Sequence, residues 1–287
     1  MRTTCVTIFA ATIVVCAAIA ADGQSGAAEM FPLPPRATAV VTNAAAVMEA
    51  KVFNGAKGGA LRYRMLSPAT VEAGRRYPLV LFLHGAGERG DDNAMQLLWG
   101  VWPLVTYMRQ KGIEGYVIAP QCPAGKQWVD TPWSQLAHKM PEKPSEPMAL
   151  TMELLDDIIS SRPVDMNRVY VTGLSMGGYG TWDIVQRRPE IFAAAIPVCG
   201  GGDATLAWKI RSVPIWTFHG DKDNAVPVER SRQMVSALWQ CDGNVRYREY
   251  PGVGHGCWIA TYNDNQVLDW FFSQVKKSAG TIPAKPL

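Results

Sequence analysis

A serine between two glycines lies near the middle of the sequence. Residues 173–177 read Gly-Leu-Ser-Met-Gly and follow a short apolar run, residues 169–172, that predicts a buried strand. A helix is expected to begin near Gly178. A tight strand-to-helix turn forces its serine into a strained backbone conformation, and flanking glycines leave room for that turn. Ser175 is therefore the candidate nucleophile, although the same pattern also occurs in ordinary glycine-rich turns.

A serine nucleophile needs a base to take its proton and an acid to orient that base. His255 is the candidate base because it lies in a glycine-rich turn after the last predicted strand, residues 245–250. The loop at residues 219–227 offers two acids. We favour Asp223, which lies deeper in the loop, and expect Asp221 to support the turn through backbone hydrogen bonds. Serine, acid and histidine then follow one another in the order that a strand-to-helix nucleophile requires.

Backbone amides that could bind an oxyanion are expected on two segments. His-Gly-Ala-Gly, residues 84–87, follows a predicted strand at residues 79–83, and we assign the amide of Ala86 as one donor. The amide of Met176, directly after the serine, is the second. His219, Asp221 and Asp223 also suggest a metal site, but Asp221 and Asp223 lack the other ligands of a calcium loop. No metal and no organic cofactor are predicted.

The surrounding pattern predicts a doubly wound, mostly parallel sheet with helices on both faces. Short apolar runs typical of buried strands lie at residues 79–83, 116–119, 169–172, 193–198 and 215–218, and an alternating run lies at 60–66. Helical spacing marks residues 148–161, 228–239 and 263–275. The five prolines between residues 121 and 147 favour a long surface loop over the carboxyl edge of the sheet.

The beginning of the chain is typical of an exported protein. Residues 1–20 combine one arginine, an uncharged run and a small-x-small site, which predicts a signal peptide; as a membrane anchor the run is too short. Residues 21–46 are interpreted as a flexible leader, 47–278 as the catalytic domain and 279–287 as a tail. The predicted location is secreted or periplasmic, with no membrane contact after cleavage.

Composition excludes some partners and leaves the cysteines open. The formal net charge of +3 is too small to argue for nucleic acid or an anionic membrane, and 48% hydrophobic residues suit a globular core. Four cysteines follow the predicted signal peptide: Cys122, Cys199, Cys241 and Cys257. They could form disulfides or remain free thiols, and their spacing does not decide between these states.

Taken together, four segments resemble a bacterial family of predicted peptidases related to the phospholipase/carboxylesterase, feruloyl-esterase-like and prolyl-oligopeptidase groups of α/β-hydrolases. These segments are residues 77–90, 173–178, 219–227 and 250–255. The resemblance implies the α/β-hydrolase fold. It also implies that Gln121, Trp128 and Trp258 border the substrate cleft, where aromatic side chains could stack on a sugar or an aromatic acyl group.

The expected activity is hydrolysis of carboxylic esters through an acyl-enzyme on Ser175. The expected substrate is a small-molecule or polysaccharide-linked ester. Three alternatives remain: a prolyl-oligopeptidase-like peptidase, an acyltransferase of the same fold and a non-catalytic binding module. Esterase is favoured over peptidase because the chain has no room for the large propeller domain that gates peptides in prolyl oligopeptidases.

Overall fold

A single eight-stranded sheet forms the centre of the protein in the computed structural model, which describes residues 35–276. The strands are β1 (Glu49–Asn54), β2 (Ala60–Leu66), β3 (Tyr77–Leu83), β4 (Tyr116–Pro120), β5 (Val164–Leu174), β6 (Ala194–Val198), β7 (Ile215–Gly220) and β8 (Val245–Tyr250). The predicted signal peptide, the first part of the leader and the predicted tail lie outside the described residues.

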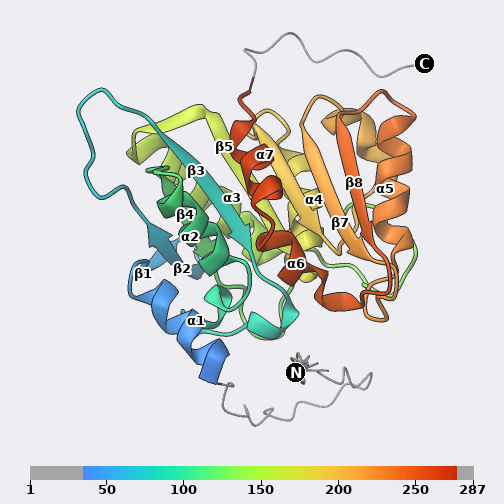
Figure 1. Ribbon diagram of the computed structural model, residues 1–287, viewed down its shortest axis with the longest axis horizontal. Helices are drawn as coiled ribbons and strands as arrows, with labels where there is room; N and C mark the ends of the chain where they lie inside the picture. The colour runs from blue at the N-terminus through green and yellow to red at the C-terminus, as the bar shows by residue number, and fades with distance from the viewer. Residues whose placement is uncertain (1–34, 277–287) are drawn as a thin grey trace, which may run out of the picture. The chain divides into compact units, whose positions relative to one another are not determined.

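The strand order is β1-β2-β4-β3-β5-β6-β7-β8 (Figure 1). β1 and β2 pair antiparallel with each other, and β2 pairs antiparallel with β4, whereas every pairing from β4 to β8 is parallel. The chain passes from β3 to β4 on one side and then returns to place β5 on the other side of β3. The loops after β3 and β5 therefore diverge, and such a switch point is where ligands bind in open α/β sheets.

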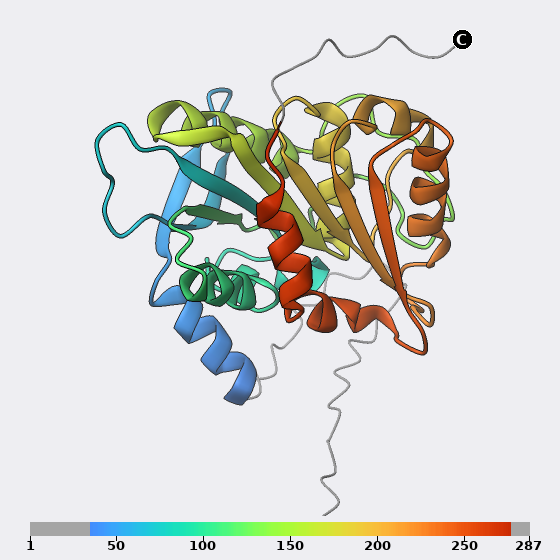
Figure 2. The ribbon, with the colours of Figure 1, turned by 45° about the horizontal axis from the view of Figure 1, so that its top comes forward.

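Helices cover both faces of the sheet (Figures 1 and 2). One face carries α1 (Pro35–Ala45), α2 (Val101–Gln110), α6 (Trp258–Tyr262) and α7 (Asn265–Ser273), and the other carries α3 (Glu146–Ser161), α4 (Met176–Arg187) and α5 (Glu229–Trp239). Successive side chains of β3 alternate between the two cores: Leu79 and Leu81 face α3 and α4, and Val80 and Phe82 face α2 and α7. This is the predicted α/β-hydrolase arrangement, and the fold prediction is confirmed.

The prediction of a flexible leader over residues 21–46 is wrong for its last part, because residues 35–45 form α1. Ala37, Val40 and Ala44 lie on one face of this helix, and Ala44 is fully buried. Their short side chains make a weak hydrophobic pattern in the sequence. Arg64 of β2 holds the end of the segment by donating to the carbonyl oxygens of Ala45 and Met48.

The predicted loop at residues 121–147 contains no helix or strand until α3 begins at Glu146. Within residues 35–276, no helix is long and apolar enough to cross a membrane.

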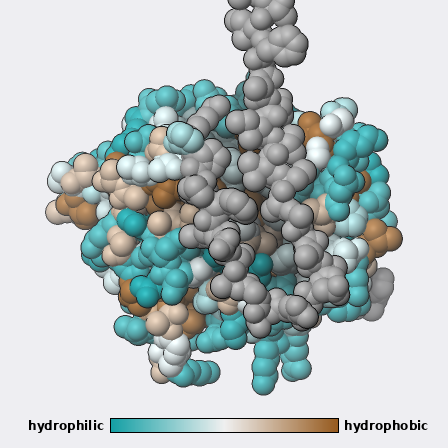
Figure 3. Space-filling view, turned by 90° about the horizontal axis from the view of Figure 1, so that it is seen from below, coloured by the Kyte–Doolittle hydropathy of each residue, from teal (hydrophilic) through white to brown (hydrophobic). Residues whose placement is uncertain are grey.

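The four cysteines of the described part, Cys122, Cys199, Cys241 and Cys257, are free thiols, so none of them forms a disulfide. On the face seen in Figure 3, hydrophobic residues form small separate groups among hydrophilic ones, which is ordinary for a protein surface.

Candidate active site

Ser175 occupies the sharp turn between β5 and α4. Its backbone angles are φ 55° and ψ −119°, a conformation that few residues other than glycine adopt, and its amide donates to the Val198 carbonyl oxygen at 2.9 Å. A Cβ on Gly177 would overlap the Leu83 carbonyl oxygen, and one on Gly173 would overlap the carbonyl oxygen of Gly177. Only glycine fits at these two positions because α4 passes so close to β3.

The structure brings together the three side chains proposed from the sequence. Ser175 Oγ lies 2.8 Å from His255 Nε2, and His255 Nδ1 lies 2.7 Å from Asp223 Oδ2. The residues follow β5, β8 and β7, respectively, and the carboxyl ends of these parallel strands meet at one edge of the sheet. With Nδ1–H donated to the carboxylate, Nε2 is free to accept the serine proton.

Asp223 is held as an anion. Its side chain is fully buried, and its Oδ1 accepts the amides of Ala225 and Val226, each at 2.9 Å. Burial alone would raise the pKa of Asp223, but hydrogen bonds from His219 and His255 outweigh burial and hold the pKa well below its usual range. Asp223 thus supplies a fixed negative charge behind the imidazole.

The neighbouring acid, Asp221, has the structural role expected for it. Its Oδ1 accepts the amide of Gly252 at 2.6 Å, in the turn just before His255. Asp221 therefore fixes the turn that carries the histidine, whereas Asp223 meets the histidine itself.

His219 is a second partner of Asp223 that the sequence did not reveal. Its Nε2 lies 3.1 Å from Asp223 Oδ2 and 3.0 Å from the Val226 carbonyl oxygen, and its Nδ1 lies 2.8 Å from Ser231 Oγ. The ring is fully buried at the end of β7. The sequence feature that could have identified His219 is its position four residues before Asp223 in the same loop.

The loop after β3 lies directly against the nucleophile. A Cβ on Gly85 would be only 3.6 Å from the Ser175 Cβ. Ala86 begins the short 3₁₀ helix η1 (Ala86–Glu88), and Met176 begins α4. Amides in a first helical turn have no acceptor within their own helix, so both are available to an oxyanion formed on a Ser175 substrate.

His84 sets the direction of the Ala86 amide. Its Nε2 accepts the Cys122 amide at 2.9 Å, so the ring proton lies on Nδ1, which donates to the Gly85 carbonyl oxygen at 2.6 Å. Burial lowers the pKa of His84 to about 4, which keeps the ring neutral. In a trans peptide, the carbonyl and the following amide point in opposite directions. Holding the Gly85 carbonyl therefore turns the Ala86 amide away from His84.

Two of the three predicted cleft residues do not border a cleft. Gln121 is 1% exposed and Trp128 is 0% exposed. Gln121 accepts the Asn93 amide at 2.7 Å and donates to the Glu88 carbonyl oxygen at 3.2 Å, and Trp128 Nε1 donates to the His84 carbonyl oxygen at 3.0 Å. The prediction is wrong for this pair because both side chains point inward, where they satisfy loop backbone groups that have no strand partner.

Trp258 does lie beside the reacting groups. Its ring packs edge-on against the His255 ring with centroids 5.1 Å apart, and Trp99, which the sequence did not single out, lies 6.3 Å from Trp258. Both indoles are partly exposed, and Ile259, the residue after Trp258, is 54% exposed. These three residues, here called the aromatic wall although Ile259 is aliphatic, offer an apolar surface next to His255.

The residues best placed to hold a metal are members of the same site. Within residues 35–276, Cys199, Asp223 and His255 each offer a ligand atom, and these atoms lie within 4.8 Å of one another. A cysteine binds metal as a thiolate, but burial raises the pKa of Cys199 well above its usual value. Asp223 and His255 already bind each other. The donor set is therefore poor for a metal and well suited to proton transfer.

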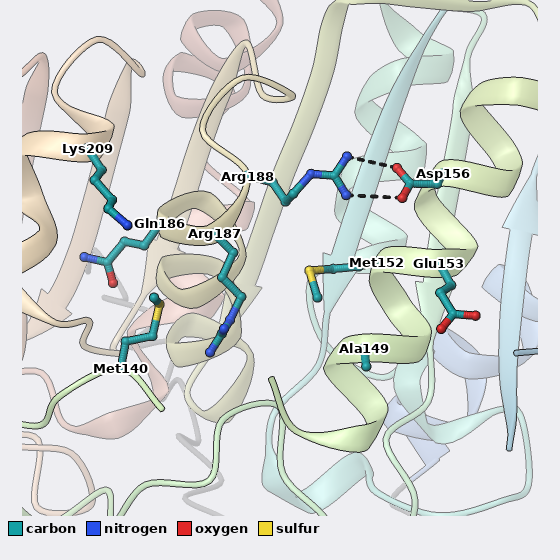
Figure 4. Close-up of a pocket in the computed structure, with 9 residues that line it drawn as sticks. All are labelled: Met140, Ala149, Met152, Glu153, Asp156, Gln186, Arg187, Arg188 and Lys209. Carbon is teal, nitrogen blue, oxygen red and sulfur yellow. Dashed lines mark hydrogen bonds and ion pairs between the residues drawn. The ribbon is translucent and has the colours of Figure 1, made fainter. Parts of the chain in front are cut away.

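A groove of about 540 Å³ lies between α3 and α4, away from this site (Figure 4). It is lined by Met140, Ala149, Met152, Glu153, Asp156, Gln186, Arg187, Arg188 and Lys209. Its two arginines are already paired, Arg188 with Asp156 at 3.0 Å and Arg187 with Asp183 at 2.7 Å. Ser175, His255 and Asp223 do not line the groove, so the groove is a surface feature separate from the candidate site.

Fold and site together define the class as an α/β-hydrolase with a serine nucleophile. A model of the phospholipase/carboxylesterase family matches residues 68–264, more than half of the chain. The chain therefore belongs to this family of esterase-type hydrolases.

Two relatives each match about 70% of this chain. A probable carboxylesterase of Arabidopsis thaliana, SOBER1-like, is 24% identical over 222 residues, covering 70% of this chain and 80% of that protein. An uncharacterized secreted protein of Arthroderma benhamiae is 24% identical over 241 residues, and this chain spans only 24% of its length.

Among solved structures, a thermostable esterase is similar with a TM-score of 0.75 and 39% identity, covering 80% of this chain and 64% of that one. This chain thus spans less than two thirds of that esterase. A ferulic acid esterase is similar in fold, with a TM-score of 0.61 and 18% identity over 79% of this chain and 98% of its own.

Proposed function

We propose that this protein hydrolyses carboxylic esters through an acyl-enzyme on Ser175. The observation that carries the proposal is the unbroken chain of hydrogen bonds from Ser175 Oγ through the His255 ring to Asp223, at 2.8 and 2.7 Å. In that chain of hydrogen bonds, His255 Nε2 can accept the Ser175 proton while His255 Nδ1 donates to Asp223. The Asp223 carboxylate at its end is buried and charged. A structural serine would not require all of these features together.

The reaction follows from this geometry. Ser175 Oγ attacks the ester carbonyl while its proton passes to His255 Nε2, and the amides of Ala86 and Met176 bind the negative oxygen of the tetrahedral intermediate. His255 then protonates the departing alcohol, leaving the acyl group on Ser175. Water repeats the sequence and releases the acid. No step calls for a metal or an organic cofactor.

The substrate is proposed to be a small or polysaccharide-linked ester with an apolar acyl group. Support comes from the aromatic wall of Trp99, Trp258 and Ile259 beside His255. Similar structures include both a thermostable esterase and an acylaminoacyl peptidase of Pyrococcus horikoshii, so peptides are the main rival substrate. Secretion or export to the periplasm is proposed from the composition of residues 1–20.

A substrate panel tests the proposal. The wild-type protein is given acetyl, longer-chain acyl and feruloyl esters and peptide substrates, with and without a competing alcohol as acyl acceptor. Ester hydrolysis faster than peptide cleavage, with the free acid as product, is the expected result. Transfer of the acyl group to the alcohol would instead indicate an acyltransferase, and cleavage of peptides alone would indicate a peptidase.

Variants connect the activity to Ser175. Ser175→Ala should abolish hydrolysis and labelling by a fluorophosphonate probe while the protein stays folded. Ser236→Ala, at an exposed position of α5, is the matched control and should retain both. A Ser175→Ala protein that kept near-full rates would exclude the mechanism, and wild-type protein that takes up no probe would favour a non-catalytic binding module.

A further inference from the structure

Glu88 is a buried acid that the proposed reaction does not use. It ends η1 and is 6% exposed, and its Oε2 has neither solvent contact nor a hydrogen-bond partner within residues 35–276. Buried carboxylates in proteins are normally paired with a cation or surrounded by donors. The Oε2 atom of Glu88 therefore departs from the usual pattern of buried carboxylates.

The carboxyl group lies directly behind residues 84–87, which follow β3 and are here called the oxyanion loop. A Cβ on Gly85 would be 2.9 Å from Glu88 Oε2 and 3.6 Å from the Ser175 Cβ, so Gly85 is sandwiched between the acid and the nucleophile. The Glu88 carboxyl group packs against Gly85, while the Gly85 carbonyl oxygen accepts a hydrogen bond from His84 Nδ1 at 2.6 Å. Gly85, the residue before Ala86, is thus held between Glu88 and His84.

The neighbouring cation, Arg89, binds backbone groups rather than the Glu88 carboxyl group. Its Nε donates to the Ala86 carbonyl oxygen at 2.8 Å, and its Nη1 donates to the Lys126 carbonyl oxygen at 3.3 Å. A proton on Glu88 Oε2 would remove a negative charge that is otherwise buried without a partner.

Burial raises the pKa of Glu88 to about 7 and outweighs the nearby Arg89 charge, which lowers it. Two neighbouring titratable groups of this loop have lowered pKa values. Burial lowers the pKa of His84 to about 4, and hydrogen bonds outweigh burial to lower that of Asp92. Across the nucleophile lies His255, the proposed base.

We propose that Glu88 is a positioning residue of the oxyanion loop, whose uncharged carboxyl group holds Gly85 so that the Ala86 amide faces the oxyanion on Ser175. The inference rests on the proposed function. An ionised Glu88 would put an unpaired negative charge behind the Gly85–Ala86 peptide, whose amide must stabilise the negative charge of the oxyanion. That repulsion slows the chemical step and leaves substrate binding unchanged, because the neutral ester carries no charge to repel.

The consequence is an alkaline limb in the rate profile. On this limb kcat falls as the Glu88 carboxyl group loses its proton. Coulomb repulsion between two like charges this close to each other, partly shielded from water, slows a reaction by roughly 3- to 100-fold. We expect kcat to fall about tenfold above the Glu88 transition.

The test measures kcat and KM for p-nitrophenyl acetate between pH 5 and 9.5 in wild type, Glu88→Gln and Glu88→Ala. Glutamine keeps an acceptor in place of Oε1 and stays neutral, so Glu88→Gln should keep at least a third of the wild-type kcat at pH 6 and lose the alkaline limb. Glu88→Ala should lose at least 30-fold in kcat with KM within threefold. Glu142→Gln, at an exposed position of the 121–147 loop, is the matched control and should reproduce the wild-type profile.

An alkaline limb that persists unchanged in Glu88→Gln overturns the proposal, as does a Glu88→Ala protein with wild-type kcat. If Glu88→Ala does not fold, the glutamine profile decides alone. Fluorophosphonate labelling of Ser175 separates this inference from the proposed function. Wild-type protein that neither labels nor hydrolyses esters overturns both, whereas an active wild type with indifferent Glu88 variants overturns only the role of Glu88.

Discussion

Replacing Asp223 by asparagine changes one charge without changing the shape of the side chain. The amide oxygen can continue to accept the amides of Ala225 and Val226, now at 2.9 Å from Asp223 Oδ1, so the loop should keep its conformation. The NH₂ group must then face His255 Nδ1 and His219 Nε2. An imidazole facing a donor at Nδ1 carries its proton on Nε2, and Nε2 can then no longer accept the proton of Ser175.

The expected loss is large and confined to the chemical step. In a serine protease the equivalent change lowers kcat about 10⁴-fold, which corresponds to about 5.5 kcal/mol of activation free energy. The assay is steady-state hydrolysis of p-nitrophenyl acetate, with thermal unfolding to show that the variant is folded. Asp221→Asn is the control, since the amide oxygen can still accept the Gly252 amide, and it should lose less than tenfold. Equal losses in the two variants, or an Asp223→Asn enzyme within tenfold of wild type, would refute the assignment.

Three further outcomes follow from packing and burial. Gly177→Ala should lower the free energy of unfolding by about 3 kcal/mol in urea titrations, because its Cβ would overlap the Leu83 carbonyl oxygen. Trp128→Phe should cost roughly 1–3 kcal/mol and lower kcat, since the buried His84 carbonyl oxygen loses its donor. Glu88→Gln should become more stable relative to wild type as pH rises. Burial raises the pKa of Glu88 from an ordinary 4.5 to about 7, so folded wild type holds a proton that the unfolded chain releases. The wild-type free energy of unfolding should therefore fall by about 3 kcal/mol between pH 4.5 and 7.

Matched variants at open or exposed positions provide the controls. Gly87→Ala adds a Cβ with no atom within 4 Å and should shift the urea midpoint little. Trp239→Phe changes an indole that is 61% exposed and should leave both stability and kcat unchanged. Glu142→Gln should show no pH-dependent gain over wild type. The packing argument for Gly177 would be wrong if Gly177→Ala were as stable as Gly87→Ala. The argument for Trp128 would be wrong if Trp128→Phe matched Trp239→Phe in stability and kcat. Parallel curves of stability against pH for Glu88→Gln and wild type would contradict the raised pKa of Glu88.

Local sequence patterns were sufficient for most of the sheet and for the nucleophile. The expected strands at residues 60–66 and 245–250 coincide with β2 and β8, and the parallel core strands differ only at their ends. Buried strands need continuous apolar runs, and a strand-to-helix turn without room for side chains needs glycine, so both leave marks in adjacent residues. β1, α1 and α2 were not predicted, because their patterns are weak and their burial depends on neighbours distant in the chain.

The sequence by itself determined the fold class, the place of Ser175 on its turn and the order in which acid and histidine follow it. Tertiary structure alone decided what lies around them. It placed His219 on Asp223, turned Gln121 and Trp128 inward beneath the oxyanion loop, and left Glu88 buried behind Gly85. The reason is physical: backbone geometry is encoded in neighbouring residues, whereas burial, hydrogen-bond partners and charge states depend on side chains that meet only when the sheet has formed.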